Sequence, residues 1–266
     1  MNIMDSNQYN NNDQNIYYEQ PGQQYYQQQQ YYQPNNPYAA VGQAASDVRD
    51  LLKNEVIAKS FLYMVAALAV TAIAAFTAPD LLAGWLMKGK YNFIILFVAE
   101  LAVVIACNVA ITKNNVAVSA ILFTLYSYLT GATLGIIFWA YDLTSVGAIF
   151  LMTAAMFGIM AIYGLVTKKD LSSVGNICMM GLIGIIIASL VNAFLIRNGI
   201  FDWIVSVIGI AIFVGLTAYD VQKIKNRVYY ATDENVACLS LWGAFSLYLD
   251  FINLFLRLLR LFGKRK

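Results

Sequence analysis

Two aspartates lie in or at the end of long apolar runs in the C-terminal part of the chain. Asp250 stands within LSLWGAFSLYLDFINLFLRLLRLFG, and Asp220 ends the preceding apolar run in VGLTAYDVQKIK. Placing an ionisable side chain in hydrocarbon costs at least about 2.5–3.5 kcal/mol, so such residues usually face a bundle interior and mark ion or proton paths. Two carboxyls brought together in a low-dielectric interior titrate as a coupled pair, which predicts a pH sensor if these two side chains meet.

Glu100 is a third acid inside an apolar run, in FVAELAVVIAC. Two readings fit it: a ligand for a proton or cation, or a protonated carboxyl that fixes helix packing. Because burying an ionisable group for packing alone is costly, we favour the first and take Glu100 as a candidate for the ion pathway.

The residues that most enzymes use for nucleophilic catalysis are missing. The chain has no histidine, which excludes Ser/His/Asp and Cys/His arrangements and HExxH zinc sites. Cys107, Cys178 and Cys238 are isolated, without CxxC spacing, and are typical of small buried side chains. We therefore expect no enzymatic activity and no resident cofactor. The net charge of +2 is small and dispersed, which argues against a nucleic-acid partner.

The composition is that of an integral membrane protein. Of 266 residues, 60% are hydrophobic and 12% charged, and the mean hydropathy is +0.60, well outside the range of soluble domains. Apolar runs of roughly 20 residues are long enough to cross a bilayer as helices. Seven such runs lie at about 57–78, 91–112, 116–140, 144–166, 173–196, 200–220 and 236–262. The sequence therefore predicts an all-α membrane protein with seven transmembrane helices and the lipid bilayer as its main contact.

The N-terminal segment has a different composition. Residues 1–45 are rich in Gln, Tyr and Asn and carry no Lys or Arg. Such a segment buries too little apolar surface to offset its ordering entropy, so we predict that it is disordered. The chain is thus divided into a disordered cytosolic tail, 1–45, and a transmembrane domain, 46–266.

Basic residues beside the spans predict the orientation. With a cytosolic N-terminus, the inner side holds Arg49, Lys53, Lys59, Lys113, Lys168, Lys169, Lys223, Lys225 and Arg227, and the outer loops hold Lys88, Lys90 and Arg197. This distribution favours a multi-pass protein of the cell membrane with its N-terminus in the cytosol. The basic residues at the C-terminus leave two alternatives for the last run: a full span that sends them outward, or a re-entrant or half-spanning segment that keeps them in the cytosol. They are Arg257, Arg260, Lys264, Arg265 and Lys266.

Whether the two aspartates meet depends on their depths in the membrane. If the last helix starts near residue 236, Asp250 lies at mid-depth, about 15 Å deeper than Asp220. A pair requires that the last helix enters the membrane late, near Leu241, or that the sixth ends deeper than its composition suggests. The sequence permits the pair without requiring it.

The stretch SLYLDFINLFLRLLRLFG, with AYDVQKIK upstream and seven spans joined by short loops, closely resembles the transmembrane Bax inhibitor motif family in its bacterial branch. The resemblance covers about residues 50–266. It implies a fold in which six helices surround a central C-terminal seventh helix, a place in the bacterial inner membrane, and the activity of a calcium-permeable leak channel that responds to pH.

The resemblance also implies roles for individual residues. Asp220, which follows Tyr219, and Asp250 match the two aspartates that share a proton in the family, and the acid of the second helix matches Glu100. The family has an arginine at the cytosolic end of that helix, able to latch onto the pair. Here the sequence reads ITKNN, so Lys113 is the nearest substitute, and its compact charge lacks the bidentate fork of arginine.

The resulting hypothesis is a pH-sensitive calcium leak gated by Asp220 and Asp250, which would also be the calcium ligands, with calcium and protons as the transported ions. All four prolines lie outside the predicted spans and no internal duplication is evident, which favours a leak over a carrier, although a proton-coupled exchanger stays open. The alternative function is a non-conducting regulator that binds other membrane proteins, such as a membrane protease, through its Tyr/Gln-rich tail.

Two glycine pairs suggest close helix packing. Gly131 and Gly135 form a GxxxG motif in the third run, and Gly181 and Gly184 lie in the fifth. Small residues at this spacing let helix backbones approach each other in membranes, so a packing role is expected for both pairs.

Overall fold

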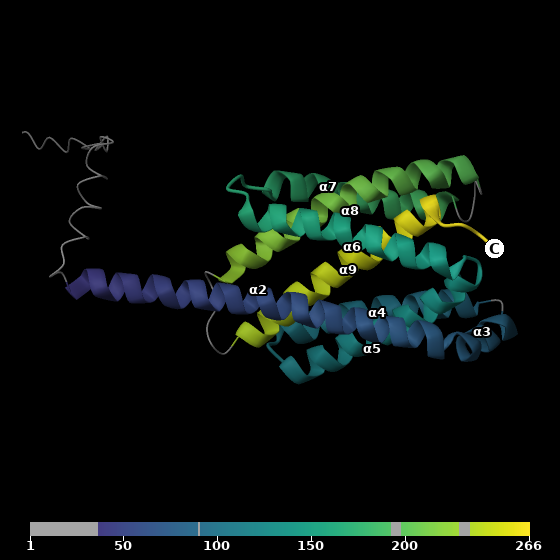
Figure 1. Ribbon diagram of the computed structural model, residues 1–266. Helices are drawn as coiled ribbons and strands as arrows, with labels where there is room; N and C mark the ends of the chain where they lie inside the picture. Colours follow the sequence, from purple (N-terminus) through teal and green to yellow (C-terminus); the bar gives the residue numbers. More distant parts are fainter. Residues whose placement is uncertain (1–36, 90, 193–197, 229–234) are drawn as a thin grey trace, which may run out of the picture. The chain divides into compact units, whose positions relative to one another are not determined.

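The computed structural model describes residues 37–89, 91–192, 198–228 and 235–266 (Figure 1). Within these ranges the chain is helical, and the only β-type pairing is an isolated bridge between Tyr141 and Arg265. The helices are α2 (Pro37–Thr77), α3 (Pro79–Lys88), α4 (Asn92–Thr112), α5 (Val116–Trp139), α6 (Leu143–Val166), α7 (Ser172–Val191), α8 (Gly199–Arg227) and α9 (Val236–Phe262). The predicted all-α class is confirmed.

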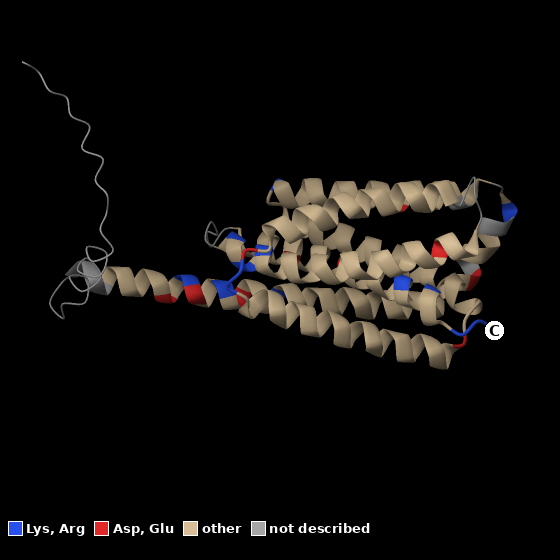
Figure 2. Ribbon diagram, turned by 90° about the horizontal axis from the view of Figure 1, so that it is seen from above, with Lys and Arg blue, Asp and Glu red and all other residues tan. Residues whose placement is uncertain are grey.

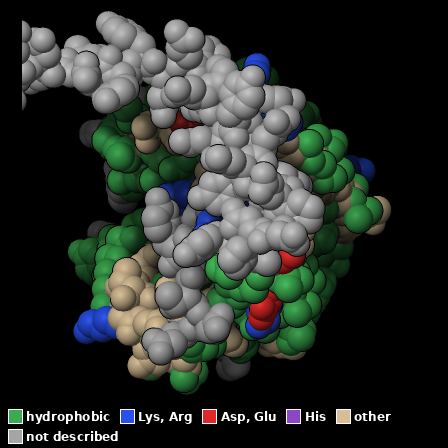
Figure 3. Space-filling view, turned by 90° about the vertical axis from the view of Figure 1, so that its left-hand side faces the viewer, with side chains coloured by type: hydrophobic (Ala, Val, Ile, Leu, Met, Phe, Trp, Pro, Cys, Tyr) green, Lys and Arg blue, Asp and Glu red, His purple; other side chains and the backbone are tan. Residues whose placement is uncertain are grey.

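Seven of these helices, all except α3, are long and apolar enough to cross a membrane. They coincide with the seven predicted runs. Their outward faces carry many exposed Ile, Leu, Val and Phe side chains, visible as hydrophobic surface on the flanks in Figure 3, whereas charged residues lie mainly toward the two ends of the helices in Figure 2. This distribution suits a multi-pass membrane protein whose flanks contact lipid.

Three helix boundaries differ from the prediction. Helix α2 begins at Pro37, so residues 37–45, expected to be disordered, are helical, since proline suits a first helical turn and the following AAVGQAASDVRDLL is rich in helix formers. The rest of the predicted tail, residues 1–36, lies outside the described residues. Pro79 likewise starts α3, where we expected a loop. Helix α8 continues seven residues beyond Asp220.

The described residues fall into two units that divide between Val48 and Arg49. In the second unit, α9 is the most buried span: 67% of its apolar window is buried, against 17–39% in the other six. Figure 1 shows α9 between α6 and α8 on one side and α4 and α5 on the other. It packs on α4, α5, α6 and α8, and Ser60 of α2 donates a hydrogen bond to the Ser240 carbonyl of α9. Helix α7 packs mainly on α8.

Helices α8 and α9 form an antiparallel pair, and two contacts fix their alignment. At one end Arg260 of α9 lies 3.7 Å from Asp202 of α8. At the other end the Arg227 guanidinium of α8 lies 3.9 Å from the centre of the Trp242 ring of α9. Between these points, Asp220 comes level with about residue 247, roughly one helical turn from Asp250.

Glycines bring several backbones into direct contact. A Cβ added at Gly131 or Gly135 of α5 would collide with the carbonyl of Thr71 or Ala75 of α2. The predicted packing role of this GxxxG motif is confirmed. A Cβ at Gly181 would meet Ile212 of α8, but one at Gly184 would meet nothing within 4 Å, so only Gly181 of the second pair is in a close helix contact.

The end of α9 bears on the alternative that the sequence left open for the last run. Helix α9 is continuous for 27 residues, to Phe262, about 40 Å. The chain then turns back along the α5–α6 connection: the Asp142 amide donates to the Lys264 carbonyl (2.9 Å), and the Lys266 amide to the Ala140 carbonyl (3.1 Å). The last run is therefore one continuous helix, long and apolar enough to cross a membrane, as a full span requires.

Candidate functional site

Asp250 is buried in the interior of the helix bundle. Leu247 and Leu254, one turn before and after it on α9, are fully buried, so the same helix face turns the aspartate inward. Its side chain is 5% exposed, and Oδ2 has no hydrogen-bond partner among the described residues. Leaving a buried carboxyl oxygen without a partner costs about 1–3 kcal/mol or more, which the fold tolerates at this position. Such a group is a candidate for function.

Asp220 lies across the α8–α9 interface from Asp250. It is half-buried, and its neighbours Leu216, Thr217 and Val221 on α8 are buried. Because α8 continues to Arg227, Asp220 lies about 10 Å before the end of the helix. The two carboxyls are close enough to interact electrostatically, although no hydrogen bond joins them among the described residues.

The two acids thus share a poorly solvated interface between two antiparallel helices. Like charges in such a place repel strongly, because the surroundings screen them less than water does. A single proton between them removes most of that repulsion. The arrangement can therefore exist in two charge states that differ in how strongly α8 and α9 attract each other.

Positive charge reaches Asp220 from its own helix. Lys223 and Arg227, three and seven residues further along α8, interact electrostatically with the Asp220 carboxyl. Both cations lie over the Trp242 ring of α9, at 5.4 and 3.9 Å from its centre. We did not single out Arg227 or Trp242 in the sequence. The i, i+3, i+7 spacing in DVQKIKNR would have indicated this cluster if α8 had been expected to continue.

Lys113, the candidate latch, is exposed at the C-terminal cap of α4. Among the described residues no ion pair joins it to Asp220 or Asp250. The structure therefore does not bring Lys113 to the aspartates in this conformation, and the cations beside Asp220 come from α8 instead.

Glu100 lies apart from the aspartates, between α4 and α5. It is half-buried and accepts a hydrogen bond of 2.7 Å from the Thr133 hydroxyl. That hydroxyl also contacts the Leu129 carbonyl of its own helix at 3.1 Å. Glu100 is thus a satisfied interhelical link, and its surroundings give it a partner that Asp250 lacks.

A buried polar contact beside Asp250 was not evident in the sequence. Tyr248, two residues earlier on α9, is fully buried, and its hydroxyl lies 2.7 Å from the Thr71 hydroxyl of α2. Thr71 also contacts the Ser127 carbonyl of α5 at 3.0 Å. This contact ties α2, α5 and α9 together, and no spacing within one helix could have indicated it.

No cluster of three or more His, Cys, Asp or Glu side chains that could hold a metal ion occurs in the described part of the chain. Asp220 and Asp250 alone would supply two carboxylates, whereas calcium takes six to eight oxygen ligands. The pair therefore fits a passing, partly hydrated ion better than a resident one.

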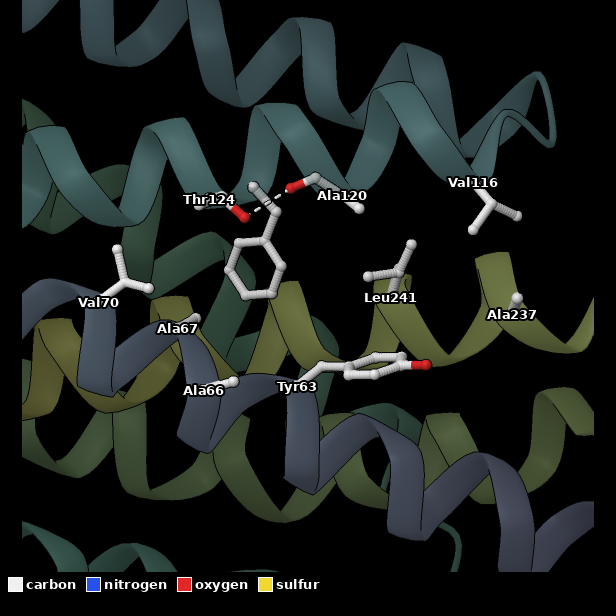
Figure 4. Close-up of a pocket in the computed structure, with 10 residues that line it drawn as sticks. Tyr63, Ala66, Ala67, Val70, Val116, Ala120, Thr124, Ala237 and Leu241 are labelled. Carbon is white, nitrogen blue, oxygen red and sulfur yellow. Dashed lines mark hydrogen bonds between the residues drawn. The ribbon is translucent and has the colours of Figure 1, made fainter.

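A cavity of about 270 Å³ between α2, α5 and α9 lies away from these acids (Figure 4). Its wall is mostly alanine and aliphatic side chains, with the Tyr63 ring along one side. Neither aspartate nor Glu100 is among its lining residues. The cavity is therefore separate from the candidate ion-pathway residues.

Comparison with known proteins places the chain among bacterial membrane proteins. The sequence model described as "Inhibitor of apoptosis-promoting Bax1" matches residues 53–266. The inner membrane protein YbhL of Escherichia coli K12 is 45% identical over 215 residues, 79% of this chain and 92% of YbhL. RP147 of Rickettsia prowazekii is 40% identical over 211 residues, 78% of this chain and 89% of RP147. A protein of Borreliella burgdorferi is 38% identical over 220 residues, 81% of this chain and 94% of the relative.

Proposed function

Since the chain belongs to the Bax inhibitor family, we propose that this multi-pass membrane protein is a pH-sensitive, calcium-permeable leak channel gated by Asp220 and Asp250. We place it in the bacterial inner membrane with its N-terminus in the cytosol. The inner-membrane location is supported by the name of the YbhL relative, and the orientation by the distribution of basic residues along the sequence.

One observation carries the proposal. Asp250 is 5% exposed, has a buried oxygen without a partner among the described residues, and lies within electrostatic reach of a second acid on the neighbouring helix. A carboxyl kept in this state serves no packing purpose, because an apolar side chain of similar size would pack there without the desolvation cost.

The gate follows from the charge states of the pair. With one proton between the two carboxyls, α8 and α9 remain packed together. Loss of that proton leaves two negative charges at the interface, which repel each other and attract a cation. Lys223 and Arg227 offset part of the charge on Asp220, so Asp250 is the residue whose charge is least compensated.

Calcium is the cargo that this pair suits best, because it prefers carboxylate and carbonyl oxygens and accepts irregular coordination. The two carboxylates would replace part of its hydration shell, and water would supply the rest. Binding by so few protein ligands is weak, which a permeating ion requires in order to leave. The proposal includes no resident cofactor and no enzymatic step.

The test is calcium entry into liposomes that contain the full chain, measured from pH 5 to 8. The wild type should show entry that depends on pH, whereas Asp250→Asn and Asp220→Asn should each flatten the profile, since either change removes the shared proton. Asp80→Asn is the matched control, because Asp80 is an exposed acid in the first turn of α3, and its profile should equal that of the wild type.

An Asp250→Asn protein with the wild-type pH profile would eliminate the pair as the sensor. Calcium entry that occurs only against an opposing proton gradient would indicate a proton-coupled exchanger instead of a leak.

The regulator alternative rests on the N-terminal segment, since the family match begins only at residue 53. A chain lacking residues 1–36 keeps α2 whole and should conduct like the wild type if the channel proposal is right. Absence of calcium flux in both proteins, with binding to a membrane protease lost in the shortened chain, would favour the regulator.

A further inference from the structure

An apolar groove of about 270 Å³ runs between α2, α5, α6 and α9. Its floor includes Ile252 and Phe255 of α9, both buried, and its rim includes Phe76 of α2, which is 70% exposed, and Leu143 and Phe150 of α6, which are also exposed. The groove is thus open to the outer surface of the helices.

The position of the groove indicates what fills it. All four helices that line it are long and apolar enough to span a membrane, so the surroundings of its open side are hydrocarbon. Nearly all of its wall is aromatic or aliphatic, with the Thr71 side chain engaged in its own hydrogen bonds. A flexible acyl chain fits such a wall, because it needs no polar partner.

Basic residues are fixed beside one end of the groove. Phe138 and Leu143, at that end, flank the α5–α6 connection. The segment Lys264–Lys266 is held on this connection by backbone hydrogen bonds to Ala140 and Asp142 and by the Lys264 amide, which donates to the Ser145 hydroxyl at 3.0 Å.

The side chains of Lys264, Arg265 and Lys266 are exposed, and Asp142 is the one acid of the connection. Three cations therefore lie on an ordered segment at the end of the groove that is nearest the α5–α6 connection. A phospholipid whose acyl chain fills the groove would place its anionic phosphate beside them. Basic residues near a membrane surface attract anionic lipid headgroups.

We propose that the groove holds one acyl chain of an anionic phospholipid and that Lys264, Arg265 and Lys266 bind its headgroup. This site is separate from Asp220 and Asp250, because neither residue lines the groove. The lipid proposal therefore does not depend on the proposed gate.

Gly147 allows the groove to be filled without disturbing the fold. It lines the groove, and a Cβ added to it would meet nothing within 4 Å. Gly158 of the same helix is equally unobstructed and is not among the lining residues. Gly147→Leu therefore obstructs the groove, and Gly158→Leu is its matched control.

The experiment adds phosphatidylglycerol or phosphatidylcholine to the delipidated full chain in detergent and counts the retained lipids by native mass spectrometry. The wild type and Gly158→Leu should retain one phosphatidylglycerol at least about tenfold more than phosphatidylcholine, which corresponds to about 1.4 kcal/mol. Gly147→Leu should lose retention of both lipids. Replacing Lys264, Arg265 and Lys266 together by Gln should remove the preference between the two lipids.

Equal retention of the two lipids by the wild type would overturn the proposal, as would wild-type retention by Gly147→Leu. Loss of retention in Gly158→Leu as well would indicate ordinary lipid around the whole protein and would also overturn it. If Gly147→Leu instead abolishes a dimer seen by size-exclusion chromatography, a second copy covers the groove and the lipid proposal fails. Thermal unfolding of each variant checks that it is folded.

Discussion

Asp250 and Glu100 are both acids within membrane-spanning helices, but they differ in burial and in hydrogen bonding. Glu100 lies half-buried between α4 and α5 and accepts a hydrogen bond from Thr133. Asp250 is almost fully buried between α8 and α9, with one oxygen lacking a partner among the described residues and a second acid nearby. The first acid is a satisfied link between two helices, and the second retains an electrostatic cost.

This difference separates a packing role from a functional one. A satisfied buried polar group adds to the specificity of packing and costs little. An unsatisfied one lowers stability, and proteins tolerate such groups mainly where activity needs them. From the sequence, Asp250 was a gate residue and Glu100 a pathway candidate with a packing role left open, and the hydrogen bond from Thr133 supports the packing role for Glu100.

The largest expected effect comes from removing Asp250, whose Oδ2 has no hydrogen-bond partner among the described residues. Asp250→Leu should raise the free energy of unfolding by about 1–3 kcal/mol, because it removes a carboxyl oxygen that is buried without a hydrogen-bond partner among the described residues. Unfolding in mixed micelles with increasing sodium dodecyl sulfate measures this change. Asp250→Asn keeps a polar group in place and should give a smaller gain. A clear loss of stability in Asp250→Leu would show that this carboxyl holds the helices together.

A smaller effect of opposite sign is expected at Glu100. Thr133→Val removes the hydroxyl that donates to Glu100 and should lower the free energy of unfolding by about 0.6 kcal/mol, the average for such interhelical bonds in membranes. The control is Thr124→Val on the same helix, since the Thr124 hydroxyl bonds only the Ala120 carbonyl of α5. If the two variants lose the same stability, the link between Thr133 and Glu100 contributes nothing.

The smallest effect is expected at Asp170, an exposed acid in the connection between α6 and α7. The Ser172 hydroxyl and amide donate to its carboxylate at 2.7 and 2.9 Å, and these hydrogen bonds lower the pKa of Asp170. The pKa of Asp170 is thus lower in the folded than in the unfolded protein, where it is about 3.9. The ionised carboxylate therefore stabilises the fold above that pH, and this contribution is lost as the pH falls through the pKa of the folded protein.

Asp170→Asn should therefore lower the thermal midpoint slightly at pH 7, and the difference from the wild type should shrink toward pH 3. Scans of both proteins at the two pH values measure it. A difference that stays constant with pH would mean that the charge of Asp170 does not contribute.

Much of the fold could be read from the sequence because membrane insertion depends on local composition. The apolar runs define α4, α5 and α6 to within one or two residues, and the GxxxG of α5 indicates a close helix contact. The start of α2 at Pro37 and the short helix α3 were missed, because both contain polar or punctuating residues that resemble loops. The extension of α8 through VQKIKNR was missed for the same reason.

The sequence by itself determined that this protein has seven helices long and apolar enough to span a membrane and that Glu100, Asp220 and Asp250 lie in or at the end of them, since hydropathy and helix length are properties of a single segment. Only the tertiary structure decided which acid has a partner. It placed Thr133 beside Glu100 and Asp220 near Asp250, and it directed the end of α9 to the α5–α6 connection. These outcomes depend on how different helices align, and that alignment results from packing contacts between residues far apart in the chain.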